Sequence, residues 1–410
     1  MQTVVFPLWN ESHHLLVFFR TCRKFSCLKK LLLNLLALPF QLLAFSQTDS
    51  SHLRISLLTC TPGDELYSTF GHSAIRVKDS ANGYDIIYNY GTFDFDDPDF
   101  YIKFAKGKMQ YFVSQAPIGK FILEYQDDKR GITEQQLQLN SEEKFQLAAA
   151  LRTNALEQNK FYLYDFLYDN CSSRLRDIVN KHVSSPLVFK TILSRPVTFR
   201  NMIHEYLDKG NQPWSKLGID ILLGSKLDIL VKNEQAMFLP DYLMKGFDSA
   251  SSAGQPIVEK KSILLPAGAT NEAGVISPFW VFSILFILVA ILSISNTRGA
   301  NRFFKVFDFL LFLITGLLGI LLAVMWIGRI DTVCSNNYNL LWALPLNAYM
   351  AFCIIKQKAW VKKYWLAAAI LQVLLILLWK WLPQQMNTAL LPIVLLLLLR
   401  YVMRYKKVPA

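Results

Sequence analysis

The feature that most constrains this chain is a series of apolar stretches that fills its C-terminal third. A helix needs about 20 mostly apolar residues to cross a bilayer, and each stretch approaches that length, although the third and fifth are short. Charged residues make up 18% of the 410 residues, against roughly 25% in a soluble domain. The sequence therefore predicts an all-α membrane domain over residues 275–410. Its five predicted spans are residues 275–295, 303–327, 340–355, 364–382 and 389–403.

Basic residues alternate between the loops that connect these stretches. They follow the first, third and fifth stretches, whereas the two opposite loops contain only Arg329, with Lys380 at one border. Because cytoplasmic loops carry the excess of lysine and arginine, the pattern predicts a cytoplasmic C-terminus and an outer location for the segment before Val275. The net charge of +12 is thus explained by membrane orientation. Nucleic-acid binding is excluded, since it needs basic residues interleaved with aromatic ones on one face.

The first 47 residues have the pattern of an export signal. A basic cluster that ends at Lys30 precedes a short apolar stretch, residues 31–45, which small and polar residues follow. This order is typical of a secretory signal, and the stretch is short for a membrane span. A retained N-terminal anchor is the alternative. In either case residues 48–265 form an exported domain, and residues 266–274 link it to the membrane domain.

The exported segment is predicted to be a mixed α+β domain. Alternating apolar residues predict strands over Arg54–Cys60, Ser73–Val77 and Tyr84–Tyr90, separated by turn residues. Apolar periodicity predicts a helix capped at Ser141 and another over Cys171–Lys181,. The predicted fold class is an α+β exported domain followed by an all-α transmembrane helical bundle.

A cysteine at the start of a predicted helix is the main candidate for chemistry. Cys171 lies in the first turn, where unpaired amides and the helix dipole favour a thiolate. The same helix N-terminus, at Asn170 and Ser172, is a candidate oxyanion site. A thiol nucleophile needs a base, and His72 at the start of a strand is the candidate. Asn89, on a neighbouring strand, is the candidate for the group that orients the imidazole.

Other interpretations of these residues stay open. Cys60 and Cys171 would share an oxidising compartment, so a disulfide between them competes with a catalytic role. That disulfide would leave a non-catalytic domain that binds lipid or a partner, and His72 would be a structural histidine. The cysteines and histidines have no zinc-type spacing, so neither a metal nor a cofactor is expected.

The motifs around these residues resemble a known group of enzymes. The histidine strand precedes the cysteine helix, as in the circularly permuted papain-like group of NlpC-type and LRAT-type proteins. The complete layout, an exported domain joined to five spans, resembles the Lnb-type lipoprotein N-acyltransferases of Gram-negative bacteria. The resemblance rests on Gly71-His72-Ser73-Ala74-Ile75-Arg76-Val77, Asn89-Tyr90-Gly91-Thr92-Phe93 and Asp169-Asn170-Cys171-Ser172.

This resemblance implies a thiol acyltransferase in the bacterial inner (cytoplasmic) membrane, with its catalytic domain in the periplasm. Cys171 would take an acyl chain from a phospholipid while His72 accepts its proton. The thioester would pass the chain to the α-amine of a lipoprotein's N-terminal diacylglyceryl cysteine. The expected partners are therefore a phospholipid donor, a lipoprotein acceptor and the bilayer. Asn89 is inferred from its position alone, and a periplasmic cysteine amidase or peptidase acting on envelope peptides is the alternative function.

Polar and aromatic residues gather at the outer end of the third apolar stretch. They are candidate contacts to a lipid headgroup, although such residues are also common at membrane interfaces without binding anything. These candidates are Asn337, Asn339, Trp342 and Asn347.

Overall fold

The computed structural model describes residues 52–94, 96–268, 274–295, 297–355 and 358–407. The predicted signal, residues 1–47, lies outside the described residues, and so do residues 269–273 of the predicted linker. The N-terminal part of the described chain is a mixed α and β domain, and the C-terminal part is helical, as the sequence predicts.

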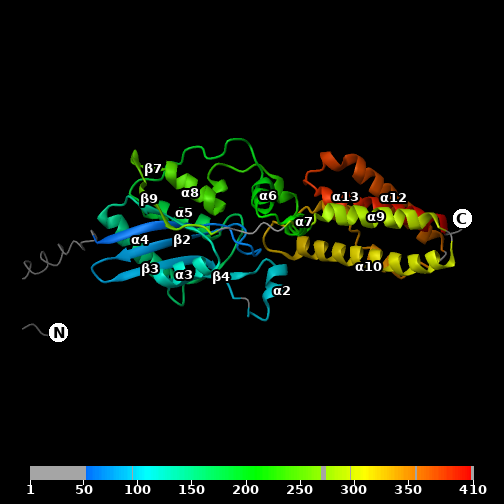
Figure 1. Ribbon diagram of the computed structural model, residues 1–410, viewed down its shortest axis with the longest axis horizontal. Helices are drawn as coiled ribbons and strands as arrows, with labels where there is room; N and C mark the ends of the chain where they lie inside the picture. The colour runs from blue at the N-terminus through cyan, green and yellow to red at the C-terminus, as the bar shows by residue number, and fades with distance from the viewer. Residues whose placement is uncertain (1–51, 95, 269–273, 296, 356–357, 408–410) are drawn as a thin grey trace, which may run out of the picture. The chain divides into compact units, whose positions relative to one another are not determined.

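An antiparallel sheet of seven strands forms the framework of the N-terminal domain (Figure 1). Its strand order is β6-β4-β3-β2-β1-β5-β9. The three predicted strands are confirmed as β1, β2 and β3, which lie side by side near its centre. The strands are β1 (Leu53–Cys60), β2 (His72–Asp79), β3 (Tyr84–Thr92), β4 (Gln110–Pro117), β5 (Ile132–Leu137), β6 (Phe161–Leu163) and β9 (Val258–Leu265).

Helices cover both faces of this sheet because its strands alternate apolar side chains between two cores. On one face, Ile55 and Leu57 belong to a core that also contains residues of the covering helices, and Cys171 packs against this core. On the other face, Leu58 and Cys60 pack with Phe121. The first face is covered by α4 (Ser141–Asn154), α5 (Cys171–His182) and α8 (Pro240–Ser249), and the second by α3 (Ile118–Asp127).

Asparagine caps start both long helices on the first face. The cap of α4 is Asn140 and not the predicted Ser141, because the Asn140 side chain accepts the amide of Glu143 and the Glu143 carboxylate accepts the amide of Asn140. The predicted start of α5 at Cys171 is confirmed, with Asn170 as its cap. Such reciprocal bonds satisfy amides that have no partner inside the helix.

A third core lies beside the sheet and contains the segments that approach the membrane domain. It is built from α6 (Phe199–Lys209), the second half of α7 (Pro213–Leu222) and two 3₁₀ turns, η1 (Ser225–Asp228) and η2 (Gln235–Phe238). The remaining elements of this domain are the short helix α2 (Phe100–Ala105) and the hairpin of β7 (Ser251–Ser252) and β8 (Gln255–Pro256).

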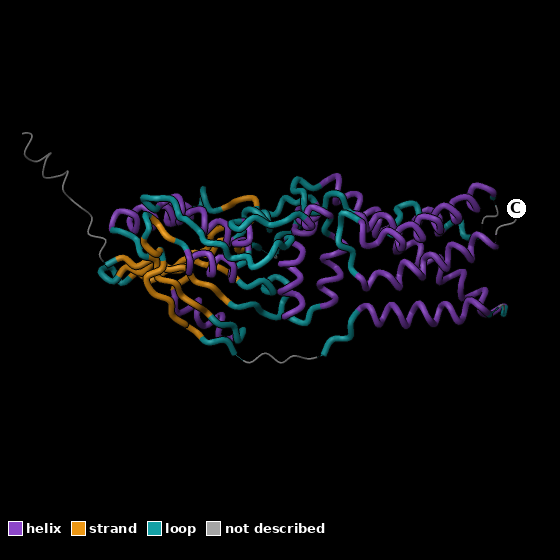
Figure 2. Tube along the Cα trace, turned by 90° about the horizontal axis from the view of Figure 1, so that it is seen from above, coloured by secondary structure: helices purple, strands orange, loops and turns teal. Residues whose placement is uncertain are grey.

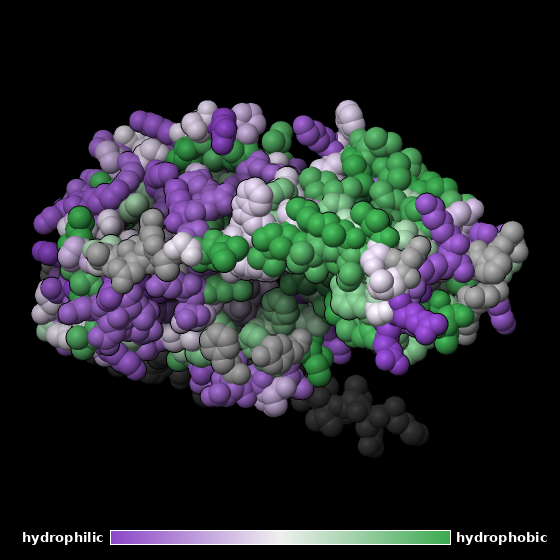
Figure 3. All heavy atoms as spheres, turned by 45° about the vertical axis from the view of Figure 1, so that its right-hand side comes forward, coloured by the Kyte–Doolittle hydropathy of each residue, from purple (hydrophilic) through white to green (hydrophobic). Residues whose placement is uncertain are grey.

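Long helices that lie side by side make up the membrane domain, as Figure 2 shows. Among the residues that the structure describes, three helical segments are long and apolar enough to cross a bilayer: Arg298–Gly328, Ala359–Trp381 and Thr388–Lys407. A fourth, Pro278–Ile294, is apolar but has 17 residues. Leucine and isoleucine side chains are exposed along these helices, and Figure 3 shows the resulting apolar surface. In the labels of Figure 1 the helices are α9 (Pro278–Ile294), α10 (Arg298–Gly328), α12 (Ala359–Leu378) and α13 (Leu391–Lys407).

The third apolar stretch is not the continuous helix that the sequence predicts over residues 340–355. It contains a 3₁₀ turn, η3 (Tyr338–Leu341), and a short helix, α11 (Asn347–Ala351). Pro345 lies between them and cannot donate a helical hydrogen bond. Two glycines of α10 let this irregular segment pack directly against that helix. A Cβ at Gly316 or Gly319 would overlap the backbone of the segment.

Candidate functional site

The fold brings Cys171 and His72 together by packing α5 across the sheet at β2. A buried serine follows each of these residues, and the two serine hydroxyls hydrogen-bond each other, with 2.9 Å between Ser73 Oγ and Ser172 Oγ. The imidazole of His72 lies near enough to the thiol of Cys171 to lower its pKa. The start of α5 and the start of β2 therefore meet at one point, with the imidazole beside the sulfur.

Asn89 lies on the other side of the imidazole. Its Oδ1 atom is 3.3 Å from Nε2 of His72, and β3 pairs with β2 directly. Because Nε2 faces Asn89, Nδ1 is the ring nitrogen left for the thiol. The structure thus brings together the three residues for which the sequence predicts catalytic roles, and it orders them as thiol, imidazole and amide.

The electrostatics of this group favour a thiolate. Burial raises the pKa of the Cys171 thiol, but the charge of His72 and its hydrogen bond, together with bonds from the Ser73 amide and the Ser172 hydroxyl, outweigh burial. The net pKa of Cys171 therefore lies below its ordinary value of 9.0. A depressed pKa is what a nucleophilic cysteine needs near neutral pH.

Two glycines allow the close packing on either side of this pair. Gly71 has φ +76°, and a Cβ there would lie 2.6 Å from the carbonyl oxygen of Cys60. Gly91 has φ +89°, and a Cβ there would contact Cys171 at 3.5 Å. Positive φ at both positions favours glycine, so each motif glycine has a steric reason to stand beside its functional residue.

The predicted oxyanion groups are arranged differently from the expectation. Asn170 Oδ1 accepts the amides of Ser172 and Ser173, while its Nδ2 donates to the carbonyls of Phe166 and Phe238. The Asn170 side chain and the Ser172 amide are therefore occupied by capping. Among the described residues, the Cys171 amide has no hydrogen-bond acceptor. That amide is the first-turn donor available to an oxyanion.

The alternative of a disulfide between Cys60 and Cys171 does not agree with the structure. Both residues are free cysteines, and they belong to cores on opposite faces of the sheet. Burial raises the pKa of the Cys60 thiol to about 12. The surroundings of Cys60 therefore disfavour its thiolate, whereas those of Cys171 favour one.

A cavity of about 380 Å³ opens beside Cys171. Its lining is mainly apolar and aromatic, and it includes Tyr111 and Tyr164, whose rings stack with centroids 4.0 Å apart. The wall is shared between the two domains, because Met325 of α10 and Val333 also line it. Ligand sites commonly have 300–1,000 Å³ and apolar walls with few polar groups. The volume and lining of this cavity suit a mainly apolar ligand, and Cys171 is part of its wall.

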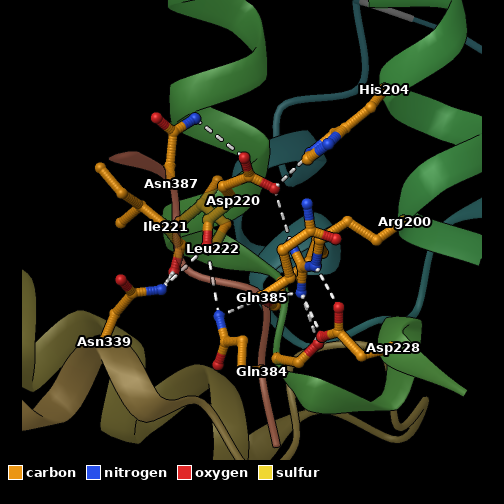
Figure 4. A network of polar contacts seen from close by, with 12 residues as sticks. Arg200, His204, Asp220, Ile221, Leu222, Asp228, Asn339, Gln384, Gln385 and Asn387 are labelled. Atoms are coloured by element: carbon orange, nitrogen blue, oxygen red, sulfur yellow. Dashed lines mark hydrogen bonds and ion pairs between the residues drawn. The ribbon is translucent and has the colours of Figure 1, made fainter. Parts of the chain in front are cut away.

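Part of the cavity wall is positioned by a buried polar network at α7, drawn in Figure 4. Asp220 Oδ1 lies 2.7 Å from Nη1 of Arg200 and 2.8 Å from Nε2 of His204. Burial raises the pKa of the Asp220 carboxyl, but His204 and then Arg200 outweigh it and hold the pKa below its ordinary value. Arg200 also pairs with Asp228 at 2.9 Å. Since Ile219 of α7 lines the cavity, the network fixes the position of a cavity wall.

The membrane domain completes this network. Asn387 Nδ2 donates to Asp220 Oδ2 at 2.9 Å, and Asn339 Nδ2 donates to the Asp220 carbonyl at 2.8 Å. Gln384 Nε2 donates to the carbonyl of Leu223 at 3.1 Å. These amides satisfy the carbonyls at the C-terminal end of α7, which have no partner inside the helix, so the membrane domain caps a helix of the exported domain.

The structure buries all four residues for which lipid-headgroup contact is predicted. Asn337 and Asn339 donate to carbonyls of α7, Trp342 donates to Asn339, and Asn347 bonds the hydroxyls of Tyr364 and Tyr401. Each is at most 3% exposed. This burial argues against headgroup contact, because the polar groups already have protein partners.

Sequence reasoning missed the cavity wall and the Asp220 network. The wall comes from segments far apart in the chain, and their apolar residues are indistinguishable from core residues by pattern. The network carried a usable signal, since Arg200 and His204 lie one turn apart on an otherwise apolar face of α6. Charged residues on an apolar helix face need buried partners. Asp220, an acidic residue in the otherwise apolar α7, is the candidate partner that the sequence offers for Arg200 and His204.

Comparison with known protein families gives two matches. A family model of the Lnb N-terminal periplasmic domain matches residues 41–205, and a model of the Lnb transmembrane domain matches residues 270–408. The first match includes His72, Asn89 and Cys171, and the second includes Met325 and Asn387. No curated protein and no solved structure matches the chain significantly.

Proposed function

The chain belongs to the family that joins the Lnb N-terminal periplasmic domain to the Lnb transmembrane domain, and from this premise we propose that it is a membrane thiol acyltransferase. It moves an acyl chain from a phospholipid, through a thioester on Cys171, to the α-amine of the N-terminal diacylglyceryl cysteine of a lipoprotein. The protein acts in the bacterial inner membrane, with its catalytic domain in the periplasm and its C-terminus in the cytoplasm.

One observation carries the proposal: a reactive thiol lies in an apolar cavity whose wall the membrane domain helps to build. A peptidase needs polar groups along an extended peptide, whereas this cavity offers mainly aromatic and aliphatic side chains. The outer end of α10 contributes Met325 to the wall, so a lipid chain can reach the thiol without leaving an apolar environment. This arrangement supports a lipid substrate over the alternative of an envelope peptide.

The first half of the reaction forms the thioester. His72 takes the proton of the Cys171 thiol, and the sulfur attacks the carbonyl carbon of a phospholipid ester. The Cys171 amide donates to the oxyanion of the tetrahedral intermediate. When the intermediate collapses, the carbon–oxygen ester bond breaks, His72 returns its proton to the departing alkoxide, and a lysophospholipid leaves.

The second half transfers the chain to nitrogen. The α-amine of the acceptor attacks the thioester carbonyl carbon, and His72 takes a proton from the attacking nitrogen. A carbon–nitrogen bond forms, the carbon–sulfur bond breaks, and Cys171 leaves as a thiol protonated by His72. Asn89 acts as a positioning residue in both halves, because it holds the imidazole through Nε2 while Nδ1 handles the proton.

Intact-mass analysis of the full-length protein tests this function. Wild type and Cys171→Ser are incubated with phosphatidylethanolamine vesicles and no acceptor. The proposal expects a mass gain of one acyl chain in wild type that hydroxylamine removes, and no such gain in the variant. Cys60→Ser is the matched control and retains the adduct. Wild-type protein that never gains a chain would refute the acyl-enzyme.

A further inference from the structure

The cavity beside Cys171 has an exposed rim and a buried wall, which side-chain exposure distinguishes. At the rim, Leu66, Tyr67 and Phe104 are 52%, 62% and 45% exposed, yet all three line the cavity. Other lining residues are almost fully buried: Ile203 and Met325 are 1% and 3% exposed. An apolar ligand in the cavity therefore contacts side chains that are buried away from solvent.

The rim is anchored at the outer end of a membrane-crossing helix. Arg329, the residue after α10, donates to the carbonyl of Phe104 and lies over its ring at 5.4 Å. The amide of Ile330 donates to the carbonyl of Lys106 at 3.1 Å. Aromatic side chains are enriched at the membrane–water interface. The proposed function therefore places this rim near the bilayer surface, where phospholipid ester groups are found.

Three residues of the buried wall come from three elements and from both domains. Ile203 comes from α6, Leu227 from η1 and Met325 from α10. All three side chains are apolar, so they offer hydrocarbon contact to a ligand. Methionine is flexible and fills irregular gaps, which makes the Met325 side chain the adjustable part of the wall.

From these observations we infer that the cavity holds the transferred acyl chain and that Met325, with Ile203 and Leu227, sets the longest chain accepted. The inference rests on the proposed acyltransferase function and adds a chain-length subsite to it. The chain enters at the rim from the outer leaflet, its ester carbonyl reaches Cys171, and its terminal part contacts this buried wall. Each additional methylene that fits strengthens binding about fourfold, whereas one that meets the wall must displace buried side chains.

A neighbouring residue of the same helix provides a matched control. Leu322 lies one turn before Met325 on α10 and is 1% exposed, but it packs in the core of the membrane domain and does not line the cavity. Truncation of Leu322 therefore disturbs the helix as much as truncation of Met325 does, without changing the cavity. The two variants separate an effect on the subsite from a general loss of packing.

The experiment measures which chain becomes attached to Cys171. Full-length wild type, Met325→Ala, Met325→Phe and Leu322→Ala are incubated with vesicles that contain equal amounts of phosphatidylethanolamines with saturated chains of fourteen, sixteen and eighteen carbons. Intact mass then gives the ratio of the hydroxylamine-labile adducts. We expect Met325→Ala to shift this ratio several-fold toward the longest chain and Met325→Phe toward the shortest, with Leu322→Ala unchanged.

Other results overturn the inference in distinguishable ways. If wild type forms adducts and Met325→Ala shows the same chain ratio, the proposed acyltransferase function stands and the chain-length subsite is rejected. A shift of equal size in Leu322→Ala also rejects it, because packing and not the cavity would then set the ratio. A wild-type protein without any adduct rejects the proposed function itself. Should Met325→Phe fail to fold, Leu227→Ala tests the same wall from the exported domain, and an unchanged ratio there counts against the subsite.

Discussion

At the scale of single residues, the state of the Cys171 thiol depends on opposing effects of its surroundings. Burial disfavours the thiolate, whereas the charge and hydrogen bond of His72 favour it and prevail. Cys60 shows the result of burial in an apolar core, since its pKa is raised to about 12. The two cysteines lie on opposite faces of one sheet, so the protein itself offers an inert reference for its reactive thiol.

The first prediction concerns the pH dependence of alkylation. Because the folded pKa of Cys171 lies below 9.0, its thiolate persists as pH falls below 9.0 and is lost only when pH falls through the depressed pKa. Iodoacetamide should therefore label Cys171 near neutral pH and leave Cys60 unmodified. In His72→Ala burial is opposed only by the bonds from the Ser73 amide and the Ser172 hydroxyl, so the pKa of Cys171 rises and labelling at neutral pH drops about tenfold for each unit of the rise.

Mass mapping of the labelled peptides across a pH series measures this effect. His52→Ala is the control, because His52 lies beside Asp79 at 3.4 Å and away from the thiol. We expect its labelling profile to match that of wild type. A His72→Ala profile that coincides with wild type would show that His72 does not hold the thiolate.

The second prediction concerns the positioning of the imidazole. Asn89→Ala removes the acceptor 3.3 Å from Nε2 of His72, so the ring loses its fixed orientation. We expect kcat for acyl transfer to fall about ten- to a hundredfold, less than the roughly 10²–10⁴-fold contribution of a general acid–base group, because His72 itself remains, with KM for phospholipid little changed. Asn89→Asp, which keeps an acceptor, should recover part of kcat.

Steady-state kinetics with phospholipid vesicles provide the measurement for Asn89. Asn82→Ala is the matched control, since the Asn82 side chain binds Asp79 in the exposed turn between β2 and β3 and lies outside the site. If Asn89→Ala raised KM and left kcat unchanged, the residue would contact substrate and would not position His72.

At the scale of elements, Cys171 is the first residue of a helix and His72 the first residue of a strand. Two helices begin at an asparagine with reciprocal capping bonds, but their surroundings differ. The Asn140 cap of α4 is exposed, whereas Asn170 of α5 is 2% exposed and also donates to the carbonyls of Phe166 and Phe238. Asn170 therefore fixes the start of α5 and, through it, the Cys171 amide and thiol.

The third prediction compares these two caps. Asn140→Ala should lower the free energy of unfolding by about 1 kcal/mol, the usual value of a lost cap, and leave thioester formation unchanged. Asn170→Ala should lower it by about 2–4 kcal/mol, since two carbonyls in buried surroundings also lose their donor. It should in addition slow thioester formation. Thermal unfolding and adduct formation on the same samples measure both effects, and equal adduct rates for the two variants would contradict the role of Asn170.

Elements with a local pattern were predictable from the sequence, and those set by distant contacts were not. Alternation predicts β1 to β3, and Asn170 before an amphipathic segment predicts α5, because both signals depend on neighbouring residues. The third apolar stretch has the composition of a span, but Pro345 and the packing of Gly316 and Gly319 make it irregular. Likewise Cys171, His72 and Asn89 stand out by residue type, whereas a cavity wall formed by Met325 requires the tertiary structure.

At the scale of the whole molecule, the polar network at Asp220 connects the exported domain to the membrane domain. Asp220 and Arg200 are 1% and 0% exposed, and removing one partner of a buried pair costs about 3–5 kcal/mol. Changing Asp220 itself would therefore threaten folding. Asn387 is the better residue to change, because it contributes one hydrogen bond to Asp220, besides the bond that it accepts from the amide of Ala389, and the ion pairs stay intact without it.

The fourth prediction is that Asn387→Ala impairs acyl transfer from a bilayer and spares chemistry at the thiol. A hydrogen bond to a charged group contributes about 1.5–3 kcal/mol, so its loss should loosen α7, whose residue Ile219 lines the cavity. We expect turnover with phospholipid vesicles to fall about tenfold, whereas hydrolysis of the water-soluble ester p-nitrophenyl butyrate, which needs no long acyl chain in the cavity, stays at the wild-type rate. Gln385→Ala is the control, since it removes only the exposed hydrogen bond to Asn201 and should leave both rates unchanged. Equal losses of both activities in Asn387→Ala would contradict this prediction. The network would then support the thiol site itself and not only the cavity that holds the acyl chain.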